Sequence, residues 1–90
     1  MEDRSISVLK RKATELGFRT EKLPSGALVF SKDNVPEIQV IAILDAYYVK
    51  YVRSGKAYVV YDLRDDVIEA IFRGYLSELK DGNVIEIPLD

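Results

Sequence analysis

The stretch AYYVKYVRSGKAYVVY, residues 46–61, contains five of the six tyrosines, arranged around a central Ser54-Gly55 pair. Valine and tyrosine, which dominate this stretch, are typical of β-strands. A Ser-Gly pair between two such runs is typical of a tight turn. We therefore predict an antiparallel hairpin closed by a two-residue loop, in which Tyr51 lies opposite Tyr58.

Neither face of this predicted hairpin is polar. Successive side chains of a strand point to opposite sides of the sheet. One face then carries Tyr48, Lys50, Val52, Ala57, Val59 and Tyr61. The other face carries Tyr47, Val49, Tyr51, Tyr58 and Val60. An antiparallel sheet in a small domain normally has one face in water, so we expect helices to cover the first face and a partner to cover the second.

The second face is the predicted interface, and its residues are Tyr47, Val49, Tyr51, Tyr58 and Val60. Tyrosine is enriched in the cores of protein interfaces. A small domain also gains stability when it buries such a face against a second copy of itself. We therefore predict a non-catalytic interaction module that forms a homodimer, with another protein as the alternative partner.

An amphipathic helix is predicted before the hairpin, over residues 5–16. Its apolar residues recur at helical spacing, and they are Ile6, Leu9, Ala13 and Leu16. Asp3 or Ser5 can cap its first turn. Gly17 followed by Phe18 is typical of a Schellman ending, in which glycine adopts the left-handed conformation.

The segment between this helix and the hairpin is predicted to be mainly strand. Residues 18–23 and 27–30 flank a Pro-Ser-Gly turn and predict a first hairpin. Residues 32–36 break the pattern and predict a loop. The density of isoleucine, valine and tyrosine over residues 37–52 favours strand, broken near residues 44–46. The proline and glutamate at its start also suit the first turn of a helix, so both alternatives remain open.

A second helix follows the tyrosine hairpin. Asp66 and Glu69 have the spacing of a capping box. The apolar stripe of this helix is Ile68, Ile71, Phe72, Tyr75 and Leu79. Gly74 would then lie inside the helix, which Lys80 and Gly82 close. The fold class is thus α+β in a single domain of residues 1–90: an N-terminal helix, an antiparallel sheet of three to five strands, a C-terminal helix and a short final strand.

The composition excludes several classes of function. The 90 residues contain no cysteine and no histidine, so the usual zinc ligands, the thiol nucleophile and the commonest general base are all absent. We therefore expect no catalytic residues, no metal, no cofactor and no enzymatic activity. No apolar run is long enough to span a membrane, and we expect a cytoplasmic protein without a membrane partner. The scarcity of thermolabile residues further indicates a thermophilic, archaeal source.

Nucleic-acid binding is the alternative function. The predicted phosphate contacts are the cations Arg4, Lys10, Arg11, Arg53 and Lys56. Tyr51 and Tyr58 would stack on bases. The net charge of −2 opposes this function, because affinity for nucleic acid depends on a cationic surface.

A second alternative is a degenerate nuclease-like fold. The stretch VPEIQVIAILDAYYVK, residues 35–50, resembles small metal-dependent nucleases, which carry an acid after proline on one strand and an acid-x-Lys motif on the next. Glu37 and Lys50 match that pattern. Tyr48 stands where the second metal-binding carboxylate belongs, so Asp45 would have to replace it. One matching carboxylate is too few to hold a divalent cation.

Overall fold

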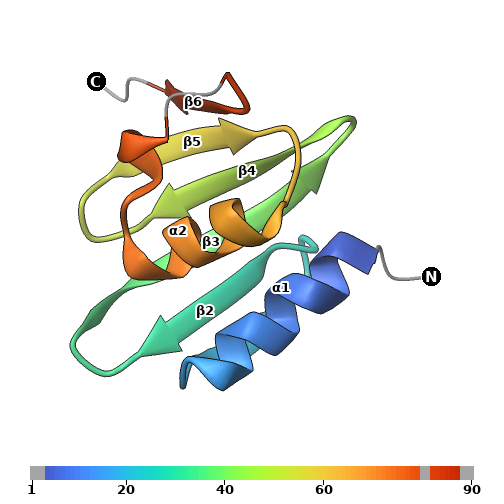
Figure 1. The fold of residues 1–90 in the computed structure, drawn as a ribbon. Coiled ribbons are helices and arrows are strands. Elements are labelled where there is room, and N and C mark those ends of the chain that lie inside the picture. Colours follow the sequence, from blue (N-terminus) through green and yellow to red (C-terminus); the bar gives the residue numbers. More distant parts are fainter. Residues whose placement is uncertain (1–3, 80–81, 88–90) are drawn as a thin grey trace.

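Two helices lie on the same face of an antiparallel sheet in the computed structural model, which describes residues 4–79 and 82–87 (Figure 1). The elements in chain order are α1 (Arg4–Glu15), β1 (Arg19–Lys22), β2 (Leu28–Lys32), β3 (Val35–Ile43), β4 (Ala46–Tyr51), β5 (Lys56–Val60), α2 (Asp65–Arg73), the 3₁₀ helix η1 (Leu76–Glu78) and β6 (Val84–Ile87). The predicted α+β class is confirmed. Over the described residues the sheet has six strands rather than three to five.

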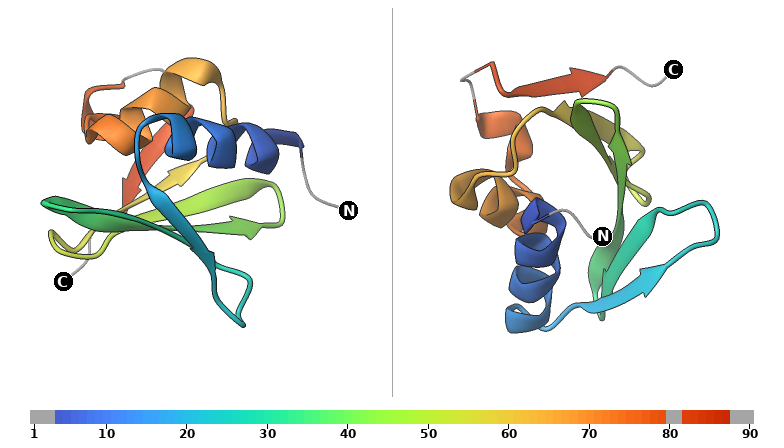
Figure 2. Two further views of the ribbon diagram at one scale, coloured as in Figure 1. Left: turned by 90° about the horizontal axis from the view of Figure 1, so that it is seen from below. Right: turned by 90° about the vertical axis from the view of Figure 1, so that its right-hand side faces the viewer.

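The strands form a meander, since each strand pairs with its sequence neighbour in the order β1-β2-β3-β4-β5-β6. The sheet curves around α1 and α2, which lie on its concave side (Figure 2). Neither helix of the described segments has the length and apolar content needed to cross a membrane.

The hydrophobic core lies between the helices and the concave face of the sheet. Its buried residues are Leu9, Ala13, Phe18, Leu28, Phe30, Ile38, Val40, Val49, Tyr58, Val60, Leu63, Val67, Ile68, Ala70, Ile71, Phe72 and Leu76. Phe72 of α2 lies between two aromatic rings, with its centroid 5.1 Å from those of Phe18 and Phe30. These contacts join α2 to β2 and to the end of α1 by aromatic packing.

The N-terminal helix follows the prediction closely. Leu9 and Ala13 are buried on its predicted stripe. Phe18 donates its N–H to the carbonyl of Ala13 at 2.8 Å, while Gly17 has φ +86°, so the Schellman ending is confirmed. Ser5 lies within the first turn, and Asp3 lies outside the described residues. Lys32 supplies an unpredicted contact by donating to the carbonyl of Leu16 at 2.8 Å, where a cation suits the end of a helix.

Residues 35–51 form strands β3 and β4, so the helical alternative for this segment is wrong. The strands are separated only by Leu44 and Asp45, close to the predicted break. The loop predicted over residues 32–36 is also shorter than expected. Lys32 pairs directly with Val35, because Asn34 adopts a φ of +66° and allows a tight turn.

The second helix is shorter than predicted and begins differently. Residue Arg64 is its N-cap, without a capping side-chain hydrogen bond, so the predicted capping box is wrong. Gly74 lies at the end of α2 in the left-handed conformation, with φ +83°, rather than inside the helix. Tyr75 and Leu79, predicted on the helical stripe, therefore lie beyond α2. The predicted short final strand is β6, while Lys80 lies outside the described residues.

Candidate functional site

The tyrosine hairpin forms, but its register differs from the predicted one. Tyr51 pairs with Lys56 and Val49 pairs with Tyr58, so the loop comprises residues 52–55 rather than two residues. Gly55 adopts a φ of +74° and donates its N–H to the carbonyl of Tyr51 at 2.9 Å. A shift of two residues leaves each side chain on its original face. The predicted division into two faces therefore holds.

The helices cover the face that was predicted to be the interface. Val49 and Val60 are 0% exposed and Tyr58 is 4% exposed, and all three belong to the core under α1 and α2. Tyr47 and Tyr51 are partly buried and pack against the same core. The prediction that a partner covers this face is therefore corrected, since the helices of the same chain occupy it.

Tyr51 has a structural role within this core. Its hydroxyl donates a hydrogen bond to the carbonyl of Ile71 at 2.6 Å, and its ring lies edge-on to Tyr58 with centroids 5.9 Å apart. Burial raises the pKa of the Tyr51 hydroxyl far above its ordinary value, and the neighbouring Tyr58 hydroxyl adds to the effect. Tyr51 and Tyr58 are therefore held within the fold, which does not leave their ring faces open for stacking on bases.

The opposite, convex side of the sheet faces away from both helices, and we call it the uncovered face. An unbroken apolar row crosses it from β3 to β6. Ile41 pairs with Tyr48, Tyr48 with Val59, and Val59 with Ile85. Ile85 is 46% exposed. Ile43, two residues after Ile41 and on the same face of β3, is 49% exposed. We call Ile41, Tyr48, Val59 and Ile85 the apolar row.

Small residues of the uncovered face are buried although no helix lies over them. They are Ala27, Val29, Ala46 and Ala57, none of which belongs to the core cluster. Larger side chains of the same face therefore shield them. Polar residues border the apolar row on one side, where Gln39 pairs with Lys50 and donates to the carboxylate of Glu37 at 3.4 Å. These polar residues are the sequence signal that could have identified this face as the one without helices.

The predicted phosphate contacts do not converge on one site. Arg4, Lys10 and Arg11 lie on α1, whereas Arg53 and Lys56 lie at the loop between β4 and β5, on the other side of the molecule in Figure 1. The five predicted phosphate contacts and the two predicted stacking tyrosines therefore do not form one surface in the described part of the chain.

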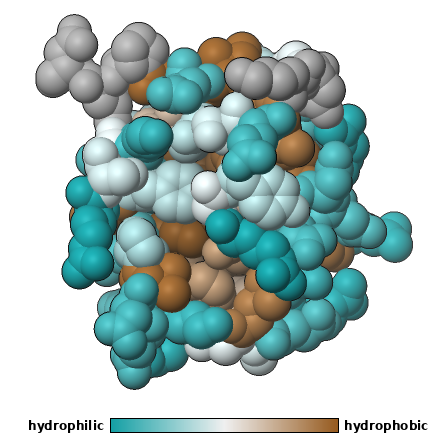
Figure 3. Space-filling view, turned by 60° about the vertical axis from the view of Figure 1, so that its left-hand side comes forward, coloured by the Kyte–Doolittle hydropathy of each residue, from teal (hydrophilic) through white to brown (hydrophobic). Residues whose placement is uncertain are grey.

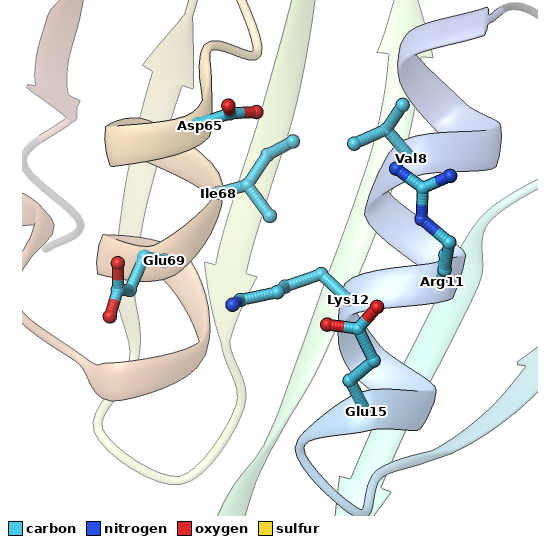
Figure 4. A pocket seen from close by; sticks show the side chains of 7 residues that line it. All are labelled: Val8, Arg11, Lys12, Glu15, Asp65, Ile68 and Glu69. Atoms are coloured by element: carbon cyan, nitrogen blue, oxygen red, sulfur yellow. The ribbon is translucent and has the colours of Figure 1, made fainter.

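Arg11 lines a hollow between the two helices, with a volume of about 240 Å³ (Figure 4). Val8 of α1 and Ile68 of α2 point toward each other across it. Charged side chains of both signs line it, namely Arg11, Lys12, Glu15, Asp65 and Glu69. Interleaved charges of both signs do not concentrate phosphate, so this hollow gives no support to nucleic-acid binding.

Of the residues that resembled a nuclease motif, Glu37 and Lys50 lie close together, because Gln39 pairs with Lys50 and donates to the Glu37 carboxylate, whereas Asp45 is remote from Glu37. Glu37 lies near the start of β3 and Asp45 just beyond its end. Six residue steps separate Glu37 from Ile43 at the end of β3, and a strand rises about 3.3 Å per residue, so Glu37 and Asp45 lie at least roughly 20 Å apart and cannot share one metal ion. Within residues 4–79 and 82–87, no group of three His, Cys, Asp or Glu side chains is placed to hold a metal.

Comparison with known proteins found no match: no family model fits the chain, and no curated protein or solved structure is significantly similar to it.

Proposed function

We propose that this protein is a non-catalytic interaction module that forms a homodimer through the uncovered face of its sheet. The apolar row is the single observation that carries the proposal. Contiguous apolar side chains at the surface of a small protein are typical of an interaction site. The aromatic ring of Tyr48 at the centre of the row is the kind of side chain that contributes most at interface cores.

The size of the uncovered face supports a weak dimer. The molecule measures 31 × 27 × 25 Å, so one face offers roughly 700 Å², close to the ~800 Å² that each partner buries in a standard interface. Because the uncovered face is convex, two copies contact each other over only part of it. We therefore expect a dissociation constant of about 10 µM or higher, in the range of weak and transient assemblies.

Charge on the uncovered face supports a second copy of the chain as the partner. A two-fold interface brings the same surface of both copies together, so that surface must be complementary to itself. Lys50 and Glu37 border the apolar row with opposite charges. A two-fold arrangement can place the lysine of one copy beside the glutamate of the other. The low net charge of −2 adds little repulsion between the copies.

Sedimentation equilibrium between about 1 and 500 µM tests the proposal. We expect the average mass of the native chain to rise from one chain toward two over this range. Tyr48→Arg should keep the mass at one chain, because a charge in the apolar row would have to be buried in the dimer. Thr14→Arg adds the same charge on the exposed side of α1 and should leave dimerisation unchanged. A native chain that stays monomeric throughout would disprove the dimer.

A further inference from the structure

A second hollow, of about 290 Å³, lies at the end of the molecule where α2 finishes. We call it the end hollow. Its walls come from the start of β3, the end of β4, β5 and the last turn of α2, and they include Val35, Pro36, Ile38, Tyr51, Tyr58 and Phe72. Figure 3 shows this side of the molecule, with apolar surface at its centre between polar side chains. The end hollow lies on the helix side of the sheet and is therefore separate from the apolar row.

Gly74, two cations and two hydroxyls complete the lining, and the polar side chains are Lys56, Arg73, Ser54 and Ser77. Among the described residues, no acidic side chain lines the end hollow, whereas three acids line the hollow between the helices. The chain as a whole is negative, so the end hollow is positive against the overall charge. A half-open apolar hollow beside positive charge favours a ligand with an apolar body and an anionic group.

Arg73 is available for such a ligand even though it has an ion pair. Its Nε donates to the carboxylate of Glu69 at 2.9 Å, and both side chains are about half exposed. A guanidinium carries five N–H donors in a planar fork, so the other donors remain able to bind a carboxylate. The Glu69 contact also restrains the Arg73 side chain, which lowers the entropy lost on binding.

We propose that the end hollow binds a small aromatic carboxylate. A volume of about 290 Å³ is at the lower end of the range for small-molecule sites, which suits a body of one or two fused rings. Parts of the Phe72 and Tyr51 rings line the end hollow and can contact an aromatic body at their edges. Lys56 and Arg73 hold the carboxylate by charge-assisted hydrogen bonds. The Tyr51 hydroxyl already donates to Ile71, so specificity for the anion comes from the two cations.

Titration calorimetry with 2-naphthoate and with the neutral, equally sized 2-naphthamide tests this site. We expect 2-naphthoate to bind with a Kd of about 10–500 µM, in line with the efficiency of small ligands. The amide should bind about tenfold more weakly, because it lacks the negative charge. Equal affinity for both compounds, or the absence of any heat from 2-naphthoate at about 5 mM, would overturn the proposal.

Two sets of variants localise the binding. Lys56→Ala with Arg73→Ala should weaken 2-naphthoate about tenfold and leave the amide unchanged. The matched control, Arg19→Ala with Lys22→Ala, removes two positive charges from the exposed strand β1 and should have no effect. Ser77→Trp, at the exposed lip of the end hollow, should block both compounds by filling the space. Unchanged binding in the first and third variants would disprove the site.

Titration of the Tyr48→Arg variant with 2-naphthoate distinguishes ligand binding in the end hollow from dimerisation through the apolar row. We expect that variant to bind 2-naphthoate with the native affinity, because the apolar row and the end hollow share no residues. A loss of 2-naphthoate binding in a folded Tyr48→Arg chain would place the ligand on the uncovered face and overturn the assignment to the end hollow.

Discussion

The hydroxyl of Tyr51 donates a 2.6 Å hydrogen bond to the carbonyl of Ile71, which ties the end of β4 to the last turn of α2. The last carbonyls of a helix lack partners within the helix. Because α2 ends at Gly74, the N–H groups of both Gly74 and Tyr75 donate to the carbonyl of Ala70. Tyr51 thus supplies the donor that the carbonyl of Ile71 would otherwise need from the next turn of the helix.

Removing this hydroxyl should destabilise the fold measurably. We expect Tyr51→Phe to lower the free energy of unfolding by about 1–2 kcal/mol, since a partly buried carbonyl loses its hydrogen bond. Urea denaturation followed by circular dichroism measures the change. Tyr61→Phe, at a residue that is half exposed on the surface, is the matched control and should change stability by less than about 0.5 kcal/mol. Equal effects of the two substitutions would contradict the structural role of Tyr51.

The raised pKa of Tyr51 should make stability depend on alkaline pH. Its pKa is higher in the folded chain than in the unfolded chain, where it is about 10. The contribution is therefore fully present below pH ~10 and is lost as the pH rises toward the folded pKa. We expect the free energy of unfolding to decline between about pH 9.5 and 11.5 in the native chain and less steeply in Tyr51→Phe. Parallel pH profiles for the two chains would argue against this effect.

The end of α2 should depend on the backbone conformation of Gly74. A Cβ atom at this position would meet nothing within 4 Å, so the cost of a side chain comes from the φ of +83° alone. We expect Gly74→Ala to lower the free energy of unfolding by about 1 kcal/mol. Gly74→Asn should lower it by less, because asparagine tolerates the left-handed region better. Thermal unfolding measures both. A larger loss for asparagine than for alanine would show that side-chain contacts, rather than φ, govern this position.

The assignment of the two sheet faces can be tested by paired truncations. Val49 lies in the core and Val59 lies on the uncovered face, partly exposed. We expect Val49→Ala to cost about 2 kcal/mol through lost burial and a cavity, and Val59→Ala to cost less than about 1 kcal/mol in the monomer. Urea denaturation at a concentration below that of dimer formation is the measurement. A reversed order would mean that the helices cover the other face.

Much of the local structure could be predicted from the sequence, because it depends on neighbouring residues. The spacing of Leu9 and Ala13 predicted α1, and the Gly17-Phe18 pair predicted its ending, both of which are confirmed. Errors arose where two local signals competed. Asp66 and Glu69 had capping-box spacing, yet α2 has Arg64 as its N-cap. The sequence around Gly74 was compatible with a helix interior. In the structure α2 ends at Arg73 and the separate 3₁₀ helix η1 begins at Leu76, so Gly74 lies at a helix end.

The sequence by itself determined which side chains of the tyrosine hairpin share a face, because alternation along a strand is a local property that survives a two-residue change of register. The tertiary structure decided which face became the core. Both faces of the hairpin are rich in apolar residues, so the choice depended on where the stripes of α1 and α2 could bury the most apolar surface across distant strands. That choice placed Val49, Tyr58 and Val60 inside the molecule and left Tyr48 and Val59 on the side without helices.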